Sequence, residues 1–131
     1  MKAYGEVAVR AAELIRSYSV ESVTEAWNTT ASAVFLHSSS LQEKGCPRSA
    51  FLGLCEKGLV SGVPAAPDGV YTRSVANKEY AVKAVQLLKQ NAALATIKPE
   101  ELWELVMSGV DKKHNSQMDV VLGLWQQGLI L

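Results

Sequence analysis

Apolar residues recur at every third or fourth position over most of the chain, which is the spacing of amphipathic helices that bury one face. Six such segments begin near residues 3, 22, 47, 78, 99 and 117. The first predicts a buried stripe from Tyr4 to Tyr18, and Asn77 is the N-cap expected for the fourth. Ser22 and Glu25 have the spacing of a capping box at the start of the second. The pattern predicts an all-α domain of about six helices.

Two pairs of segments resemble one another and follow the same order along the chain. EVAVRAAELIR (6–16) aligns without gaps with EYAVKAVQLLK (79–89), and FLGLCEKGLV (51–60) aligns with VLGLWQQGLI (121–130). The alignment predicts an internal duplication, with two pseudo-symmetric three-helix halves at about residues 3–62 and 77–131 in one compact domain, residues 1–131. A chance likeness between amphipathic helices of similar composition is the alternative.

Glycines at matched positions favour the duplication. Gly53 and Gly123 fall inside predicted helices, where Gly costs about 1 kcal/mol relative to Ala. A close helix crossing at both positions is the simplest reason for them. Each third helix also ends in Gly followed by an apolar pair, at Gly58 and Gly128, a pattern typical of a left-handed C-cap. The same register puts Cys46 at the N-cap of the third helix in the first half.

The segment between the halves, residues 63–76, is rich in Pro, Gly and Ala. Two structures fit it equally well. Residues 59–63 and 70–72 contain β-branched or aromatic residues on either side of a Pro/Gly turn, and so they could pair as a short β-hairpin. The alternative is an extended linker.

Composition limits the classes of function. The chain has 131 residues, with 13 basic against 13 acidic side chains, and 48% of its residues are hydrophobic. A balanced charge gives no overall field to attract nucleic acid or an anionic membrane, although it permits a local basic patch. No run of about 18 apolar residues is present to span a bilayer, and the amino terminus lacks the apolar core of a secretory signal. We therefore expect a soluble, cytoplasmic protein without a membrane partner.

Cys46 is the first candidate for chemistry. It lies at a predicted helix N-terminus between Lys44 and Arg48, a setting that stabilises a thiolate, and His37 is a candidate base earlier in the same loop. A capping or packing role is the alternative, which we favour because one Cys with one His is a weak pattern. Around His37 and His114 no Cys or carboxylate stands at ligand spacing, so we predict no metal and no cofactor.

A basic cluster is the second candidate. Its members lie near the third helix of the first half or in the segment that follows: Lys44, Arg48, Lys57, Arg73 and Lys78. A helix followed by a hairpin is the layout of a winged helix-turn-helix, in which the helix enters the major groove of DNA. Residues 48–57, however, offer few polar side chains to base edges, and the total charge is neutral. DNA binding is therefore the weaker alternative.

The segment KGCPRSAFLGLCEKGLVSGVP (44–64), followed by NKEYA (77–81), resembles the signature of a family of small bacterial proteins of unknown function. The resemblance implies a bacterial cytoplasmic protein. It brings no activity, substrate or catalytic residue with it, so the functional prediction rests on the residues alone.

We predict a binding module without catalysis, whose partner is another protein. The two halves differ most in the connection before the third helix, which is longer in the first half, and an added loop on a scaffold is a common place for a site. The predicted binding residues are Lys44, Cys46, Arg48, Arg73 and Lys78. A thiol-dependent activity at Cys46 with His37 is a less favoured alternative.

Overall fold

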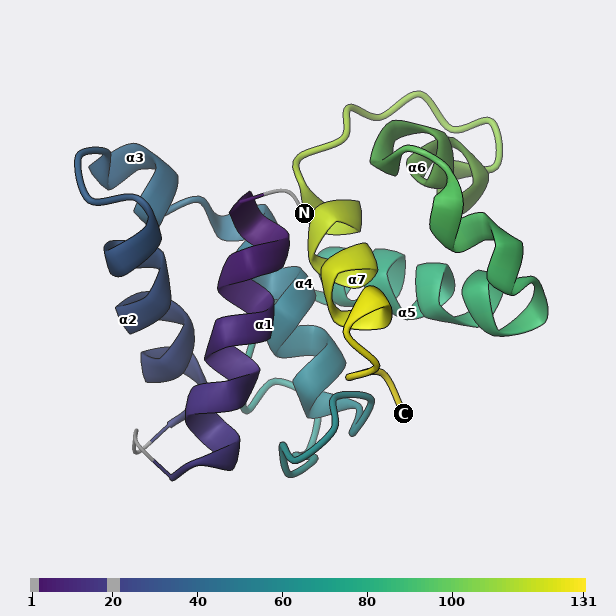
Figure 1. Cartoon of the computed structure of the whole chain (residues 1–131). Coiled ribbons are helices and arrows are strands. Elements are labelled where there is room, and N and C mark those ends of the chain that lie inside the picture. Colours follow the sequence, from purple (N-terminus) through teal and green to yellow (C-terminus); the bar gives the residue numbers. More distant parts are fainter. Residues whose placement is uncertain (1–2, 19–21) are drawn as a thin grey trace.

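The computed structural model describes residues 3–18 and 22–131, and this part of the chain is all-α, as predicted (Figure 1). Its elements are α1 (Ala3–Arg16), α2 (Val23–Val34), α3 (Ser39–Gln42), α4 (Gly45–Glu56), α5 (Val75–Gln90), the 3-10 helix η1 (Ala92–Thr96), α6 (Pro99–Met107) and α7 (Gln117–Gln126). The described residues contain no sheet, and the one β contact among them is an isolated antiparallel bridge between Val60 and Ile130.

Helices α1, α4 and α7 form the middle of the molecule, with α2 and α3 on one side and α5, η1 and α6 on the other (Figure 1). The two short third helices are the most deeply buried. All seven residues from Ala50 to Glu56 of α4 are buried, and in α7 the same holds for five residues from Val120 to Leu124. Both helices are therefore core helices, which explains why their sequences are apolar on nearly every side.

Both predicted close helix crossings are present. A Cβ atom added to Gly53 of α4 would lie 2.8 Å from the Cα of Lys78 on α5, and one added to Gly123 of α7 would lie 2.7 Å from the Cα of Gly5 on α1. Distances this short leave no room for a side chain. The alignment of residues 6–16 with 79–89, extended by one residue, pairs Gly5 with Lys78. Each half therefore contributes one helix to each crossing.

The bridge between Val60 and Ile130 also joins matched positions of the alignment. The amide of Ser61 donates to the carbonyl of Leu129 over 2.8 Å, and the amide of Leu131 donates to that of Leu59 over 2.9 Å. The alignment pairs residue 61 with 131 and residue 59 with 129, so the two hydrogen bonds are equivalent under exchange of the halves. These contacts are those expected of a pseudo-two-fold arrangement, and superposition of the complete halves stays a prediction.

Several predicted helix ends are confirmed. The Ser22 side chain accepts the Glu25 amide at the start of α2, 3.0 Å away. Gly58 and Gly128 have φ angles of +72° and +69°, so both third helices are followed by a left-handed glycine. Pro99 stands in the first turn of α6, where its missing N–H would have had no helical partner.

Three local predictions are wrong. Helix α5 begins earlier than expected, because Ser74 is its N-cap and accepts the amide of Asn77. Helix α4 has Lys44 as its N-cap, so Cys46 lies inside the first turn. Tyr18 is 93% exposed, since α1 ends at Arg16 and the chain turns away with a left-handed φ of +56° at Tyr18.

The linker, residues 63–76 as predicted from the sequence, forms no hairpin. Val60 bonds across to the C-terminal segment, and the amide of Tyr71, on the other expected arm, donates to the carboxylate of Glu56. The linker therefore passes the end of α4 as irregular backbone, with a turn between Pro67 and Val70, until α5 begins at Val75. Three of its backbone amides, those of Gly69, Tyr71 and Thr72, donate to one side chain, a partner that strand propensity does not reveal.

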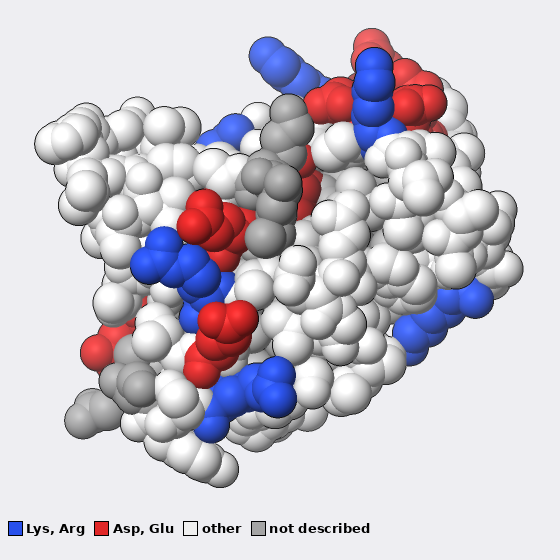
Figure 2. All heavy atoms as spheres, in the orientation of Figure 1, with Lys and Arg blue, Asp and Glu red and all other residues white. Residues whose placement is uncertain are grey.

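Charge is mixed on the face shown in Figure 2, where Lys and Arg alternate with Asp and Glu. An uncharged lobe over α2 and α3 corresponds to residues 26–42, which contain no Lys, Arg, Asp or Glu. None of the helices described combines the length and the hydrophobicity needed to cross a bilayer.

Candidate functional site

The structure divides the predicted binding residues into two groups. Lys44 lies at the start of α4 with its Nζ 5.5 Å from the centre of the Tyr4 ring, and Arg48 is partly exposed one turn further along. Arg73 and Lys78 lie at the other end, where α4 closes with Glu56. Twelve helical residues separate these ends by about 16 Å, so the five residues do not form one site.

Cys46 and His37 are not joined by any hydrogen bond within the described residues. His37 is exposed in the turn between α2 and α3, and Cys46 is partly buried in the first turn of α4. The second cysteine, Cys55, is fully buried in α4, where burial raises the pKa of its thiol. Among the described residues there is also no group of three or more His, Cys, Asp or Glu placed to hold a metal ion.

Helix α4 does not have the setting of a DNA-recognition helix. Its residues from Ala50 to Glu56 are packed in the core, between α5 and α7. The hairpin that would serve as a wing is absent from the linker, which is fully described. A major groove needs an exposed helix face with polar side chains, and α4 has none to offer over these residues.

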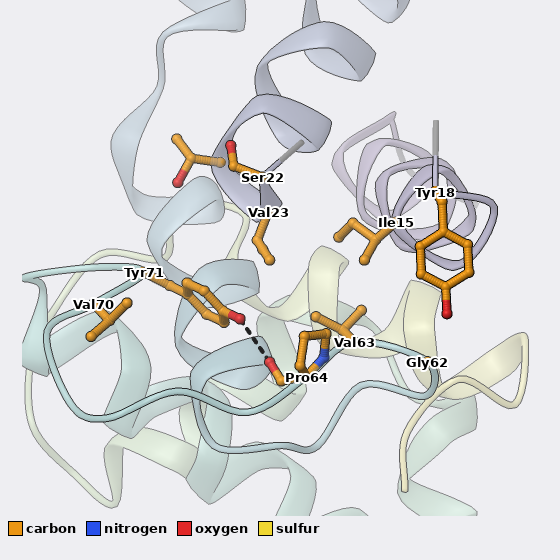
Figure 3. A pocket seen from close by; sticks show the side chains of 10 residues that line it. Ile15, Tyr18, Ser22, Val23, Gly62, Val63, Pro64, Val70 and Tyr71 are labelled. Carbon is orange, nitrogen blue, oxygen red and sulfur yellow. Dashed lines mark hydrogen bonds between the residues drawn. The ribbon is translucent and has the colours of Figure 1, made fainter. Parts of the chain in front are cut away.

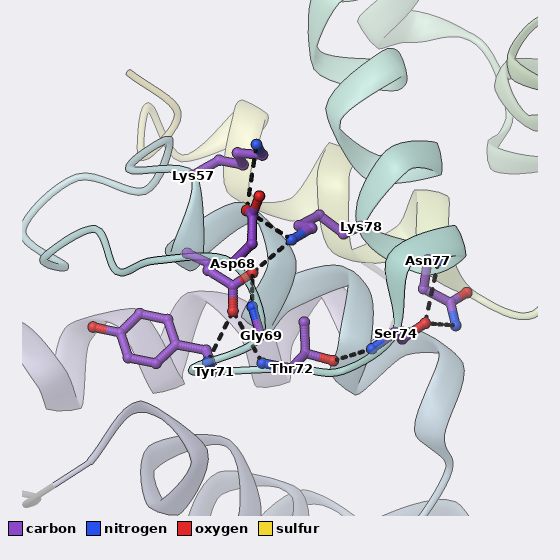
Figure 4. A network of polar contacts seen from close by, with 9 residues as sticks. Lys57, Asp68, Gly69, Tyr71, Thr72, Ser74, Asn77 and Lys78 are labelled. Carbon is purple, nitrogen blue, oxygen red and sulfur yellow. Dashed lines mark hydrogen bonds and ion pairs between the residues drawn. The ribbon is translucent and has the colours of Figure 1, made fainter.

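The carboxylate of Glu56, at the last turn of α4, has the largest set of polar contacts in the network drawn in Figure 4. Its Oε1 accepts the Lys78 ammonium over 2.6 Å and the Gly69 amide over 3.1 Å. Its Oε2 accepts the amides of Tyr71 and Thr72 over 2.8 and 3.2 Å. Both side chains of the ion pair are buried. One carboxylate thus holds three linker amides and the first turn of α5.

Asp68 completes this arrangement from the exposed side. Its Oδ1 lies 3.0 Å from the Lys78 Nζ and 3.5 Å from the Lys57 Nζ. Figure 4 shows Lys57, Asp68 and Lys78 converging beside the linker backbone. We call Glu56, Asp68 and Lys78 the linker clasp.

The clasp is charged at neutral pH. Burial alone would raise the pKa of Glu56, but the bonds from Lys78 and the three linker amides outweigh it and hold that pKa at about 2. The hydrogen bond to Glu56 raises the pKa of Lys78 against the opposing effect of burial. Lys78 and the charge of Lys57 in turn lower the pKa of Asp68. A buried pair with this many hydrogen bonds is the kind that fixes a local structure.

Sequence reasoning treated Lys78 as an exposed cation and missed Glu56 altogether. One signal was available in the repeat alignment. It pairs Glu56 with Gln126 and Lys78 with Gly5, so both partners of the ion pair are replaced together in the other crossing. The Glu56–Lys78 pair is thus present at only one of the two helix crossings, next to the segment that joins the halves. This position indicates an interaction between the pair and that segment.

A groove runs along the outer side of α5, beyond the clasp. It consists of three adjoining hollows of ≈ 670, ≈ 330 and ≈ 290 Å³. The first and second share Glu79 and Lys83, and the first and third share Lys57, Val82 and Gln86. We call these three adjoining hollows together the α5 groove.

The α5 groove has an excess of cations, and its lining includes exposed valines. Five cationic side chains line it, against two carboxylates: Lys57, Arg73, Lys78, Lys83 and Lys89, against Asp68 and Glu79. Val75 and Val82 line the first hollow and Val110 lines the second, and Val75 and Val110 are 60% and 65% exposed.

The cations differ in their availability to a partner. Lys78 belongs to the clasp, and Lys83 donates to the carbonyl of Val106 over 2.6 Å, at the end of α6. Arg73 is exposed, and within the described residues no hydrogen bond or ion pair engages its guanidinium. Of the predicted binding residues, Arg73 is therefore the one best placed to meet a ligand.

Comparison with known proteins gives the family and no activity. The model of the family of unknown function DUF6979 matches residues 1–131, and the chain belongs to that family. Neither a curated protein nor a solved structure matches the chain. Function has to be argued from the site itself.

Proposed function

We propose that this member of the DUF6979 family is a protein-interaction module that binds an acidic amphipathic helix of a partner along the α5 groove. One observation carries the proposal. Three hollows that share lining side chains adjoin one another along α5, and their lining combines several cations with the exposed Val75 and Val110.

The dimensions of the groove support a helical partner. Helix α5 has 16 residues, which correspond to about 24 Å at 1.5 Å per residue. A partner helix of three to four turns would cover that length, with apolar side chains every third or fourth residue directed at the valines. Acidic residues on its flanks would face Arg73 and Lys89. Complementary charge of this kind contributes mostly to association rate and specificity.

The proposal moves the site predicted from the sequence. It retains Arg73 as a contact residue and Lys78 as the residue that fixes the linker wall. It assigns no contact to Lys44, Cys46 or Arg48, which lie at the far end of α4. The partner is still another protein, as predicted from the sequence, but the proposed contact surface is the α5 groove.

Fluorescence anisotropy with two labelled synthetic helices tests this function. Both carry leucines at positions i, i+3, i+4 and i+7, and their polar positions are Glu in one peptide and Lys in the other. We expect the Glu peptide to bind, with an affinity that falls as salt is raised. Arg73→Glu should weaken that binding about tenfold, because a like charge then faces the peptide.

Lys113→Glu is the matched control, since Lys113 is an exposed cation outside the groove. It makes the same change in net charge and should leave the affinity of the Glu peptide unchanged. Equal losses in the two variants would mean that binding reflects total charge, and equal binding of the two peptides would mean that the groove cations do not select the partner. Either result would contradict the proposal.

We also propose a reducing, cytoplasmic location. Cys46 and Cys55 are both unpaired, and free thiols persist where glutathione and thioredoxin keep them reduced. Fractionation of cells that produce the chain, followed by thiol labelling before lysis, tests the location. Recovery of labelled, reduced protein in the cytosolic fraction is the expected result, and recovery of a cysteine-linked dimer outside it would contradict the proposal.

A further inference from the structure

A separate hollow of ≈ 790 Å³ lies between the end of α1, the start of α2 and the linker (Figure 3). Its walls are mostly aliphatic or aromatic, and they include Ile15, Val23, Val63, Pro64, Val70 and Tyr71. The α5 groove has none of these residues in its lining. We call this hollow the α1–α2 cavity.

The linker separates the two hollows. Gly69, Thr72 and Arg73 line the α5 groove, whereas the intervening Val70 and Tyr71 line the α1–α2 cavity. The two hollows therefore share no lining residue, and each presents a different set of side chains to a ligand.

Hydrogen bonds hold the walls of the cavity in place without a ligand. The Tyr71 hydroxyl donates to the carbonyl of Pro64 over 2.8 Å, and the Tyr71 amide donates to Glu56 of the clasp (Figure 3, Figure 4). Gly62 turns the chain with a left-handed φ of +79°, and a Cβ there would meet the side chain of Arg16. A site with fixed walls avoids much of the ordering cost of binding.

The lining restricts the charge of a ligand. The described residues that line the cavity include no Lys, Arg, His, Asp or Glu, and their polar side chains are the hydroxyls of Ser22, Thr24, Tyr71 and Tyr18. Arg16 packs its side chain against Gly62 but does not itself line the cavity, so an ion among the described lining residues would lose hydration without a counter-ion among them, which is costly. A neutral molecule has no such cost, and a hydroxyl or carbonyl on it would find partners among the hydroxyls.

The rim of the cavity leaves apolar surface exposed to water. Tyr18 and Val70 are 93% and 62% exposed, and both line the cavity. They approach it from two elements far apart in the sequence. A molecule bound between them would cover part of this apolar surface, which the fold leaves in water.

The geometry points to the α1–α2 cavity as a binding site for a small neutral molecule with an aromatic or alicyclic body and one polar end. Its volume falls within the range of about 300 to 1,000 Å³ that is typical of small-molecule sites, which are mainly apolar with few polar anchors. The apolar body would lie against Ile15, Val63 and Pro64. The polar end would face the hydroxyls at the start of α2.

The test is a ¹H–¹⁵N correlation NMR titration of the full chain with three probes that share one ring system. The probes are 1-naphthalenemethanol, which is neutral, 1-naphthoate, which is an anion, and 1-naphthylmethylamine, which is a cation. We expect the neutral probe to bind most tightly and to shift the amides of residues 62–63 and 70–71. Val70→Glu should weaken its binding about tenfold, because the substitution puts a charge at the apolar rim.

Val110→Glu is the matched control. Val110 is as exposed as Val70, but it lies at the α5 groove, so this variant should bind the neutral probe as the unmodified chain does. Three probes of equal affinity, shifts outside the cavity, or equal losses in the two valine variants would each overturn the proposal. Because the acidic peptide is expected to bind normally to Val70→Glu, failure here leaves the proposed function to be judged separately.

Discussion

The Lys78 ammonium donates to the Glu56 carboxylate over 2.6 Å, and both side chains are buried where the linker crosses α4. The Lys78 Cα and Cβ also lie directly over Gly53, so the helix crossing and the ion pair occupy one place. Helix α5, the linker and the end of α4 are thereby fixed to each other. The walls of the α5 groove and of the α1–α2 cavity depend on that junction.

Removal of one partner of this pair should destabilise the fold strongly. In Lys78→Met the Glu56 carboxylate stays buried without its cation, and loss of one partner of a buried pair typically costs about 3 to 5 kcal/mol. Urea unfolding followed by circular dichroism measures the loss. Lys57→Met is the control, because the Lys57 pair with Asp68 is exposed and should contribute little. A similar small effect in both variants would show that the clasp does not hold the linker.

The pH dependence of stability should reveal the Glu56 carboxylate. Its pKa is about 2 in the fold against an ordinary value of 4.5, so the unfolded chain binds its proton first as the pH falls. The stabilisation from Glu56 is therefore complete above about pH 4.5 and is lost as the pH falls towards 2. We expect the free energy of unfolding to decrease over that window. Glu56→Gln should be less stable at neutral pH and should show a shallower decrease.

His114 should give a second pH effect at higher pH. Burial lowers the pKa of His114, Lys44 adds to this, and Glu100 opposes it. Its Nε2 accepts the amide of Met118 over 3.1 Å at the start of α7, a bond that only the unprotonated nitrogen can make. The unfolded chain takes up this proton first, so stability should fall as the pH drops below about 6.5. His114→Gln should remove that decrease, whereas His37→Gln, on an exposed turn, should retain it.

The two glycine crossings should respond alike to substitution. In Gly53→Ala and Gly123→Ala the new Cβ would lie under 3 Å from backbone atoms of Lys78 and Gly5. Overpacking of this kind costs about 1 to 3 kcal/mol, against a gain in helix propensity of about 1 kcal/mol. Both variants should therefore melt at lower temperature.

Gly45→Ala is the control for the glycine pair. A Cβ at Gly45 would meet nothing within 4 Å, and this position lies in the first turn of α4. Its melting temperature should stay the same or rise. A stable Gly53→Ala next to an unstable Gly123→Ala would show that the two crossings are not equivalent, and it would weaken the case for a duplication.

Most of the fold could be predicted from local patterns. The spacing of apolar residues predicted the all-α class, and Gly58 and Gly128 predicted the ends of two helices. Both features depend only on a few neighbouring residues. The matched Gly53 and Gly123 predicted two close crossings, since Gly inside a helix needs a packing reason.

The site was harder to predict because exposure depends on tertiary packing. Lys78 has the sequence setting of a surface lysine, and it is buried only because α5 crosses α4 at a glycine beside Glu56. Cys46 and His37 are close in sequence but separated by α3, so proximity along the chain did not become contact. The hairpin was also a reasonable expectation from strand propensity, yet the amides of Tyr71 and Thr72 bond to a carboxylate.

The position of a bound partner tests the account most directly. In a ¹H–¹⁵N correlation spectrum of the full chain titrated with the Glu peptide, we expect the largest shifts at residues 68–73 and along α5, and Arg73→Glu should reduce them. The Lys44→Glu/Arg48→Glu double variant should bind the peptide normally, because both residues lie outside the α5 groove. Shifts centred on residues 44–48, with binding lost in that double variant and kept in Arg73→Glu, would contradict the assignment of the groove.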